Sequence, residues 1–262
     1  MKRKEEKELI FETHAHYDDE AFNEDREAVI KSLAAAGVET VVNIGASMDS
    51  SETTLELTRN YPFIYGTAGV HPSWTDELNE EKFQRLREII KEPKMVAVGE
   101  IGLDYYYKEP PHEIQKKWFE RQLDLAREVK LPVVIHSREA AQDTLEIMKA
   151  AKAEELGGVI HCFSYGKEMA REYLDMGFFL GVGGVLTFNN SKTLREVVKY
   201  VPMDHLVLET DSPYMAPEPN RGKRNTSANL IYVAKMMAEI KGMSPEEVIA
   251  ATEKNARRLY RM

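Results

Sequence analysis

Cysteine is nearly absent from this sequence: Cys162 is the one cysteine among 262 residues. An internal disulfide needs two cysteines, and structural zinc sites of the Cys₄ or Cys₂His₂ type also need more than one, so both are excluded. Any metal ion must therefore be held by histidine and carboxylate side chains. The low cysteine content also agrees with a reducing compartment, which favours a cytoplasmic protein.

Long apolar runs are also missing from the sequence. No stretch approaches the roughly 20 apolar residues that a membrane-spanning helix needs. The first twelve residues, MKRKEEKELIFE, are basic at the start but lack the apolar region of a secretory leader. We therefore expect a cytoplasmic chain without a membrane partner.

Positive charge is in deficit, with 35 Lys and Arg against 44 Asp and Glu, a formal net charge of −9. A protein that grips nucleic acid over its whole surface usually carries an excess of basic residues, so this class is disfavoured. Binding of a phosphate ester at one local site remains compatible with this charge.

Prolines and glycines are scattered singly and 43% of the residues are apolar, which is typical of a globular protein and excludes disordered and fibrous classes.

Short apolar runs recur along the chain and predict eight strands. They are nearly continuous rather than alternating, as expected for parallel strands covered by helices. The predicted strands are 9–14, 38–46, 63–71, 95–100, 131–136, 158–163, 178–184 and 206–211. Amphipathic segments predict helices within 24–37, 80–92, 112–130, 138–155, 167–177, 191–201, 227–242 and 244–262.

Eight such units in 262 residues predict an α/β fold, a single-domain (β/α)₈ TIM barrel over residues 1–262, because this barrel typically takes about 250 residues. A doubly wound open sheet is the main alternative. That fold would usually carry a glycine-rich turn after its first strand, and the sequence has none.

Metal-binding residue types stand at the ends of six of the predicted strands. Active sites of such barrels lie at these carboxyl ends. In chain order the residues are His14, His16, His71, Glu100, His136, His161 and Asp211. Residues i and i+2 of a strand share a face, so His14 and His16 can converge on one ion while the small Ala15 faces away.

This donor set suits Zn²⁺, Mn²⁺ or Co²⁺, whereas Mg²⁺ prefers a site richer in oxygen. Four histidines and two carboxylates are more ligands than one tetrahedral ion can bind. They fit two divalent ions roughly 3.5–4 Å apart that share a carboxylate. Glu100, which lies between the two halves in sequence, is the natural bridge. His71 is redundant for this count, so we interpret it as a substrate contact or a supporting residue.

For any one of these histidines, a surface or hydrogen-bonded role is the more common one. The metal hypothesis depends on their convergence at one rim. His112 and His205 fall outside the pattern and are assigned to the surface. Cys162 is expected to point away from the site and to pack as a small apolar residue.

Six motifs together resemble the TatD family of metal-dependent deoxyribonucleases in the amidohydrolase superfamily. They are ETHAHYD, GVHP, VGEIGLDYY, VIHSRE, HCFS and ETDSPY, in this order over residues 12–214, followed by the terminal NARRLY segment. The resemblance implies one ion at His14, His16 and Asp211, a second at His136 and His161, and Glu100 as the bridge. It also implies hydrolysis of DNA phosphodiester bonds, often from an end.

The chain departs from the family at two places. Ala15 stands where the family often has cysteine, and Thr226-Ser227 follow GKRN where the family usually has Glu-Pro. The first change should not affect metal binding. The second falls in the predicted loop nearest the substrate.

The hypothesis for the mechanism is two-metal hydrolysis, with the ions taken from Mg²⁺, Mn²⁺, Zn²⁺ and Co²⁺ and with Asp211 accepting a proton from water. Arg138 can contact a phosphate oxygen, as can Arg224 or Lys223, although the latter two suit a solvated surface equally well. Trp74, Tyr105 and Tyr106 can stack on a base, although such aromatics also anchor loops.

Three alternatives stay open. The same barrel can hydrolyse small esters, lactones or amides, although many such enzymes bridge their ions with a modified lysine where this chain has Glu100. A single-metal, deaminase-like site is disfavoured by the presence of His136 and His161. A non-catalytic barrel that binds nucleic acid or a protein is disfavoured by the acidic charge and the complete ligand set. The expected partner is DNA or another phosphodiester, and no obligate protein partner is evident.

Overall fold

The computed structural model describes residues 9–262, so residues 1–8, on which the expected absence of a leader partly depends, lie outside the described part. Eight parallel strands hydrogen-bond in chain order from β1 to β8. The strands are β1 Ile10–Ala15, β2 Val38–Asn43, β3 Ile64–Ala68, β4 Met95–Asp104, β5 Val133–Arg138, β6 Gly158–Ile160, β7 Phe179–Val182 and β8 Leu206–Leu208. The predicted eight-stranded barrel is confirmed.

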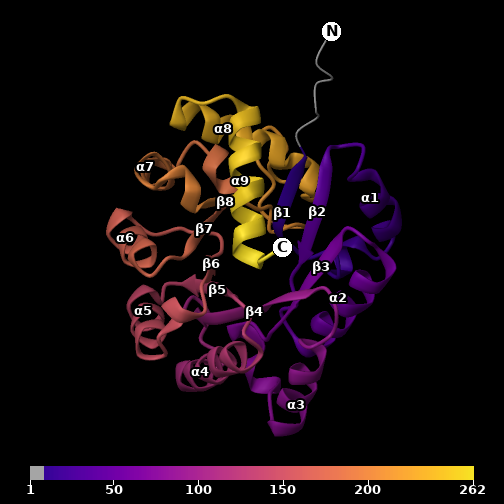
Figure 1. Cartoon of the computed structure of the whole chain (residues 1–262), viewed down its shortest axis with the longest axis vertical. Coiled ribbons are helices and arrows are strands. Elements are labelled where there is room, and N and C mark those ends of the chain that lie inside the picture. The colour runs from indigo at the N-terminus through magenta and orange to yellow at the C-terminus, as the bar shows by residue number, and fades with distance from the viewer. Residues whose placement is uncertain (1–8) are drawn as a thin grey trace.

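Helices lie around the ring of strands, and the last helix lies across it (Figure 1). They are α1 Arg26–Ser32, α2 Met48–Asn60, α3 Glu80–Ile89, α4 His112–Val129, α5 Ala141–Ala150, α6 Lys167–Asp175, α7 Lys192–Tyr200, α8 Leu230–Lys241 and α9 Pro245–Tyr260. Among residues 9–262, none of these helices combines the length and the apolar character needed to cross a membrane.

Helix α2 is not among the helices that the sequence pattern predicts. Its apolar content is low, and threonines supply much of its buried face, including Thr54 and Thr58. The Ser47 hydroxyl accepts a hydrogen bond from the Ser50 backbone N–H and so caps the helix N-terminus. Capping and close packing against β3 therefore stabilise a helix whose hydrophobic periodicity is weak.

Two apolar cores hold the barrel together. The larger lies between the sheet and the surrounding helices, and the smaller fills the barrel interior. Helix α9 contributes Ala256, Leu259 and Tyr260 to the inner core, and Figure 1 shows it crossing the middle of the strand ring. The ring of Tyr260 stacks on Phe11 and its hydroxyl donates to the Thr13 carbonyl at 2.8 Å. The interior is thus closed by α9 at one end.

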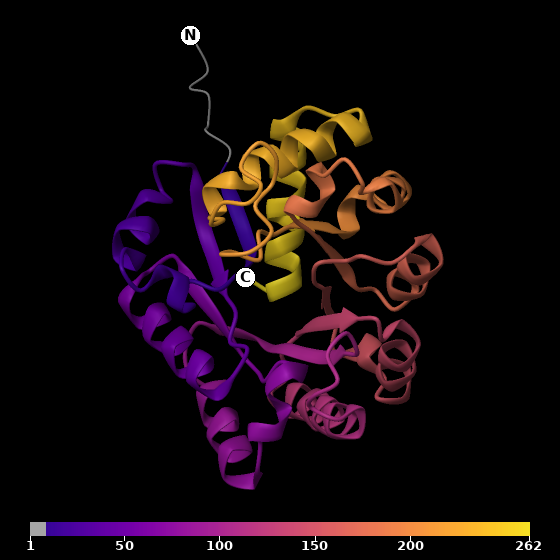
Figure 2. The ribbon, with the colours of Figure 1, turned by 180° about the vertical axis from the view of Figure 1, so that it is seen from behind.

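The first and last strands meet at the residues that the sequence singles out. The backbone N–H of Asp211 donates to the His14 carbonyl at 2.9 Å, and that of His16 donates to the Ser212 carbonyl at 2.8 Å. Figure 2, which shows the opposite face, places the orange segment after β8 beside β1. Barrel closure therefore brings Asp211 next to the two histidines.

Candidate functional site

A cavity of about 890 Å³ opens over the predicted strand ends. It is lined by five of the six residues predicted to bind metal, namely His16, Glu100, His136, His161 and Asp211. His14 lies beneath them and is 1% exposed. The structure therefore brings together all six residues, although they come from five different strands or the turns that follow them.

Strand boundaries at the site differ from the predicted ones. Strand β4 extends four residues beyond Glu100, which therefore lies within the strand rather than at its end. Strand β8 ends at Leu208, and Asp211 lies in the turn that follows with a left-handed φ of 57°. His71 and His161 likewise follow their strands instead of belonging to them. Short turns rather than regular strands thus aim several of the site's side chains.

Glu100 lies at the centre of the cluster, and each of its oxygens faces one pair of histidines. Glu100 Oε2 lies 3.5 Å from Nε2 of His14 and 3.8 Å from Nε2 of His16. Glu100 Oε1 lies 2.8 Å from Nδ1 of His136 and 2.9 Å from Nε2 of His161. One carboxylate therefore separates the site into two halves.

The first half contains His14, His16 and Asp211. The Nε2 atoms of the two histidines are 3.2 Å apart, and Asp211 Oδ1 lies 3.3 Å from that of His16 and 3.6 Å from that of His14. The other ring nitrogen of His16, Nδ1, faces the Ile44 carbonyl at 3.1 Å. That contact orients the ring so that Nε2 points to the centre.

The second half contains His136 and His161, and each ring faces a further buried carboxylate on its outer side. Nε2 of His136 lies 3.0 Å from Asp104 Oδ2, and Nδ1 of His161 lies 3.7 Å from Glu209 Oε1. Donor atoms that could hold an ion fall into three groups around the site: His14, His16 and Asp211; His14, Glu100 and His161; and His71, Glu100 and His136. The imidazole and carboxylate donors suit a transition-metal dication.

Electrostatics in the cluster favour ionised carboxylates. Burial opposes ionisation of Glu100, but the charge of His161 and the hydrogen bond from His136 hold its pKa well below the ordinary value. Burial also opposes the charged form of His16 and so lowers its pKa, but Asp211 and Glu100 outweigh burial and raise that pKa to about 9. Protonated histidines compensate the carboxylate charge in the metal-free site, so a cation that binds there would have to replace the proton of His16.

His71 lies at the edge of the second half and differs from the other histidines. Its Nδ1 accepts a hydrogen bond from the Ser73 backbone N–H at 3.1 Å, so the neutral ring carries its hydrogen on Nε2. That Nε2 lies 3.7 Å from Glu100 Oε1. Burial and the neighbouring His136 lower the pKa of His71 to about 3. His71 therefore presents a neutral N–H donor to the cavity.

The residues expected to contact substrate divide into two sets. Trp74 lines the cavity and is 55% exposed. Arg138 also lines the cavity, and its guanidinium carbon lies 3.8 Å from the centre of the Tyr106 ring. Tyr107, which the sequence analysis does not single out, lines the cavity as well.

Two expected contacts lie elsewhere. The Tyr105 hydroxyl donates to Asp143 at 2.7 Å, and its ring stacks on His112, so Tyr105 is not part of the cavity lining. Arg224 forms a two-pronged ion pair with Asp25 and also lies outside that lining. Tyr105 therefore has the alternative role of a loop anchor, whereas Arg224, for which a solvated surface position is the alternative, is instead paired with Asp25.

The expectation that Cys162 points away from the site is wrong. Strand β6 ends at Ile160, and Cys162 takes a left-handed φ of 45°, so the alternation of strand faces no longer applies there. Cys162 lines the cavity, with its Sγ 3.7 Å from Sδ of Met215, and burial raises the pKa of its thiol to about 12.

The two histidines assigned to the surface differ in exposure. His112 is exposed as predicted, whereas His205 is half-buried and faces the Phe178 carbonyl.

Three buried acidic residues near the site are missed by the sequence analysis: Glu12, Asp104 and Glu209. Each has a position signal that could have revealed it. Glu12 precedes His14 by two residues, Asp104 follows Glu100 by four, and Glu209 precedes Asp211 by two, spacings that would place each pair on one face of a regular strand. An acidic residue at even spacing from a candidate ligand on a buried strand needs a partner in the barrel interior.

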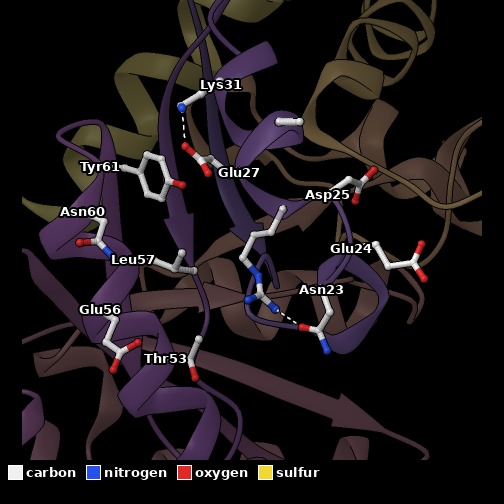
Figure 3. A pocket seen from close by; sticks show the side chains of 12 residues that line it. Asn23, Glu24, Asp25, Glu27, Lys31, Thr53, Glu56, Leu57, Asn60 and Tyr61 are labelled. Atoms are coloured by element: carbon white, nitrogen blue, oxygen red, sulfur yellow. Dashed lines mark hydrogen bonds and ion pairs between the residues drawn. The ribbon is translucent and has the colours of Figure 1, made fainter.

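A second pocket, of about 720 Å³, lies on the outer surface between α1 and α2 (Figure 3). Lys31 pairs with Glu27 inside this pocket, Arg26 donates to the Asn23 side chain, and Asp25 pairs with Arg224, which does not line the pocket. None of the six metal-binding candidates lines it. The chemistry of the chain is therefore concentrated in the cavity over the strand ends.

Comparisons with known proteins agree with this site. The family model described as "TatD related DNase" matches residues 11–261. The chain is 42% identical to the uncharacterized metal-dependent hydrolase YabD of Bacillus subtilis, covering 97% of this chain and 100% of that protein. It is 34% identical to the 3'-5' ssDNA/RNA exonuclease TatD of Cronobacter sakazakii, covering 96% of this chain and 97% of that protein.

Among solved structures, YjjV, a TatD homologue from Escherichia coli, superposes with a TM-score of 0.91 at 29% identity, covering 97% of this chain and 98% of that one. The match extends over the barrel and its closing helix, and the relatives are metal-dependent hydrolases by name. The chain belongs to the TatD family of metal-dependent hydrolases.

Proposed function

We propose that this protein is a two-metal deoxyribonuclease that hydrolyses phosphodiester bonds of single-stranded DNA. The main support for this proposal is the position of the Glu100 carboxylate between two pairs of histidines. One oxygen faces His14 and His16, and the other faces His136 and His161. A carboxylate that serves two donor sets is what a pair of ions with a shared ligand requires.

His14, His16 and Asp211 would hold the first ion, His136 and His161 the second, and Glu100 would bridge them. When bound, such ions supply Lewis-acid chemistry, because they polarise a phosphoryl oxygen and acidify water. Mg²⁺, Mn²⁺, Zn²⁺ and Co²⁺ all enter the proposal, and the four histidines favour the last three.

The chain's own residues would carry the proton transfer and orient the substrate. Asp211 lines the cavity. Burial raises its pKa, but His16 and His161 outweigh burial and lower that pKa below the ordinary value, so the side chain is an ionised carboxylate. In this form it can accept a proton from water. Nε2–H of His71 would donate to a phosphoryl oxygen. Arg138 is the one Lys or Arg side chain in the described cavity lining, and it would pair with a phosphate.

Several observations support nucleic acid as the substrate. Trp74 and Tyr107 offer exposed aromatic faces next to the polar centre, as proteins that bind single strands often do. The family model carries the description DNase, and one relative is named a 3'-5' ssDNA/RNA exonuclease. The low cysteine content supports a cytoplasmic location for this activity.

The test is cleavage of single-stranded DNA labelled at the 3' or the 5' end, with EDTA and with added Mn²⁺, Zn²⁺, Co²⁺ or Mg²⁺. We expect metal-dependent cleavage by the wild-type protein and loss of cleavage in Glu100→Ala and Asp211→Asn. Glu139→Gln, a charge change at an exposed position on the loop after β5, is the control.

Wild-type-like cleavage by both site variants would contradict the proposal. Faster turnover of lactones, cyclic amides or phosphotriesters than of DNA would favour the small-ester hydrolase instead. The first outcome would argue against the metal centre itself. The second would keep the metal centre and assign it a different substrate.

A further inference from the structure

We propose that Asp104 is a positioning residue that fixes the His136 ring so that Nδ1, and not Nε2, faces the metal centre. This inference rests on the proposed two-metal site. It assigns a role to a carboxylate that belongs to none of the groups of possible metal ligands.

The His136 ring lies between two carboxylates. Nε2 lies 3.0 Å from Asp104 Oδ2, while Nδ1 lies 2.8 Å from Glu100 Oε1 and 3.4 Å from Nε2 of His161. Asp104 is 3% exposed, so water does not compete for this contact. The two nitrogens of one ring thus face different partners, and only Nδ1 points to the cluster centre.

An ionised carboxylate accepts hydrogen bonds and cannot donate them. A neutral imidazole carries one hydrogen, and Glu100 at Nδ1 and Asp104 at Nε2 are its two possible acceptors. Asp104 therefore supplies the acceptor that lets the hydrogen stay on Nε2 when a cation takes Nδ1. The lone pair of Nδ1 then points to the centre, ready to bind a cation. Carboxylates that support a ligating histidine in this way also make it a stronger donor.

Asp104 is itself held in place by buried contacts. Its second oxygen, Oδ1, accepts the Tyr106 backbone N–H at 3.0 Å, which leaves Oδ2 for His136. The Gln115 side chain, which is buried on α4, accepts the Asp104 backbone N–H at 2.9 Å and donates to the Asp104 carbonyl at 3.0 Å. The carboxylate is therefore oriented from both its backbone and its side chain.

Strand geometry explains why Asp104 reaches His136. Glu100 and Asp104 are four residues apart on β4, and Gly102 between them pairs in register with His136. A Cβ on Gly102 would lie 1.9 Å from the His136 carbonyl oxygen, so a residue without a side chain is needed there. This close approach of β4 and β5 brings the Asp104 carboxylate beside the His136 ring.

His161 has a comparable carboxylate, but the contact is weaker. Glu209 Oε1 lies 3.7 Å from its Nδ1, beyond hydrogen-bond distance, and instead accepts the Cys162 backbone N–H at 2.5 Å. The supporting hydrogen bond is therefore formed at His136 and not at His161, and the inference concerns Asp104.

Asp104→Ala removes the acceptor, and Asp104→Asn keeps the volume while replacing the carboxylate with an amide. Two readouts test them on the full chain. Nitrogen-15 NMR of metal-free protein, at an alkaline pH where the ring is neutral, reports which nitrogen of His136 carries the hydrogen. Calorimetric titration with Mn²⁺ reports the affinity of each ion.

We expect the wild type to populate the Nε2–H tautomer, because Asp104 competes with Glu100 for the hydrogen, and Asp104→Ala to hold the hydrogen on Nδ1, where Glu100 is the remaining carboxylate. We also expect the second Mn²⁺ to bind about 10–100-fold more weakly in the variants, with the first unchanged. Asp143→Asn is the control, because Asp143 bonds the neighbouring Tyr105 without contacting His136. It should leave both readouts as in the wild type.

Folded Asp104 variants that keep both the wild-type tautomer and both affinities would overturn the inference. A wild-type protein that binds fewer than two ions would contradict the proposed function instead. In that case the NMR comparison still decides on Asp104, since it needs no metal.

Discussion

The imidazole rings of His14 and His161 stack almost in parallel, with centroids 3.9 Å apart and an angle of 13° between their planes. Their Nε2 atoms face different oxygens of Glu100, at 3.5 Å for His14 and 2.9 Å for His161. The two halves of the site are therefore in direct ring contact, and the position of one ring depends on the other.

Although the halves are in contact, each should lose one ion when its own outer histidine is removed. His16→Ala and His136→Ala are each expected to lower the bound metal from two ions to one per chain, because each removes an imidazole that the remaining ligands do not replace. Hydrolysis should fall by at least about 100-fold in both. Elemental analysis of desalted protein measures the metal content.

The exposed His112→Ala supplies the control and should retain two ions. Two ions retained in either site variant would argue against the ligand assignment. A fully active wild type with one ion would favour the single-metal alternative.

Removing metal should lower thermal stability. A ligand at 100 times its Kd stabilises the folded state by about 2.7 kcal/mol, which corresponds to roughly 5–10 °C in Tm for a chain of this size. We expect that increase when Mn²⁺ or Zn²⁺ is added after EDTA treatment, measured by differential scanning calorimetry. Glu100→Ala should show a much smaller increase, and an equal increase in that variant would place the binding elsewhere.

Trp74→Ala should weaken substrate binding more than turnover. Base stacking on an aromatic face is worth about 1–3 kcal/mol, so KM for single-stranded DNA should rise about 5- to 150-fold while kcat changes little. Tyr200→Ala is the matched control, because Tyr200 is similarly exposed, at 48%, but ends α7 away from the cavity lining. Equal KM values for Trp74→Ala and the wild type would remove Trp74 from the substrate contacts.

Glu12 should make the metal-free protein less stable as the pH rises. Burial raises the pKa of this fully buried carboxyl to about 7, against 4.5 for an exposed glutamate. A carboxyl with a raised pKa in the folded state carries no penalty below about pH 4.5, and it increasingly opposes folding as the pH rises to about 7. Glu12→Gln removes this charge and should therefore gain stability relative to the wild type over that window.

The gain should reach about 3 kcal/mol at most. Denaturant unfolding of both proteins in EDTA between pH 4.5 and 8 gives the difference. A difference that does not change with pH would show that Glu12 does not titrate in this range.

The parts of the site that the sequence predicts are those where local pattern and position coincide. His14 and His16 lie two residues apart at the end of one predicted strand, and Glu100 and His136 follow equally clear apolar runs. Strand order then brings them together, because all carboxyl ends of a parallel barrel point the same way. The eight strands were predictable for the same reason.

Other features depend on contacts that no local pattern contains. Arg224 forms an ion pair with Asp25, which lies 199 residues away in the sequence. Cys162 turns into the cavity because its backbone leaves the strand conformation. Asp104 acquires its partner because β4 continues past the predicted end at Glu100. Each of these depends on tertiary geometry rather than on residue type.

The junction of β1 with the turn after β8 has a consequence for biosynthesis. Asp211 reaches His14 only through barrel closure, so the candidate ligands are complete only after synthesis has passed residue 211 of the 262 residues. Because domains of this topology form their long-range contacts late, a nascent or truncated polypeptide would lack the assembled centre. A newly made chain would thus acquire its metal ions late in folding, after the last strand has joined the first.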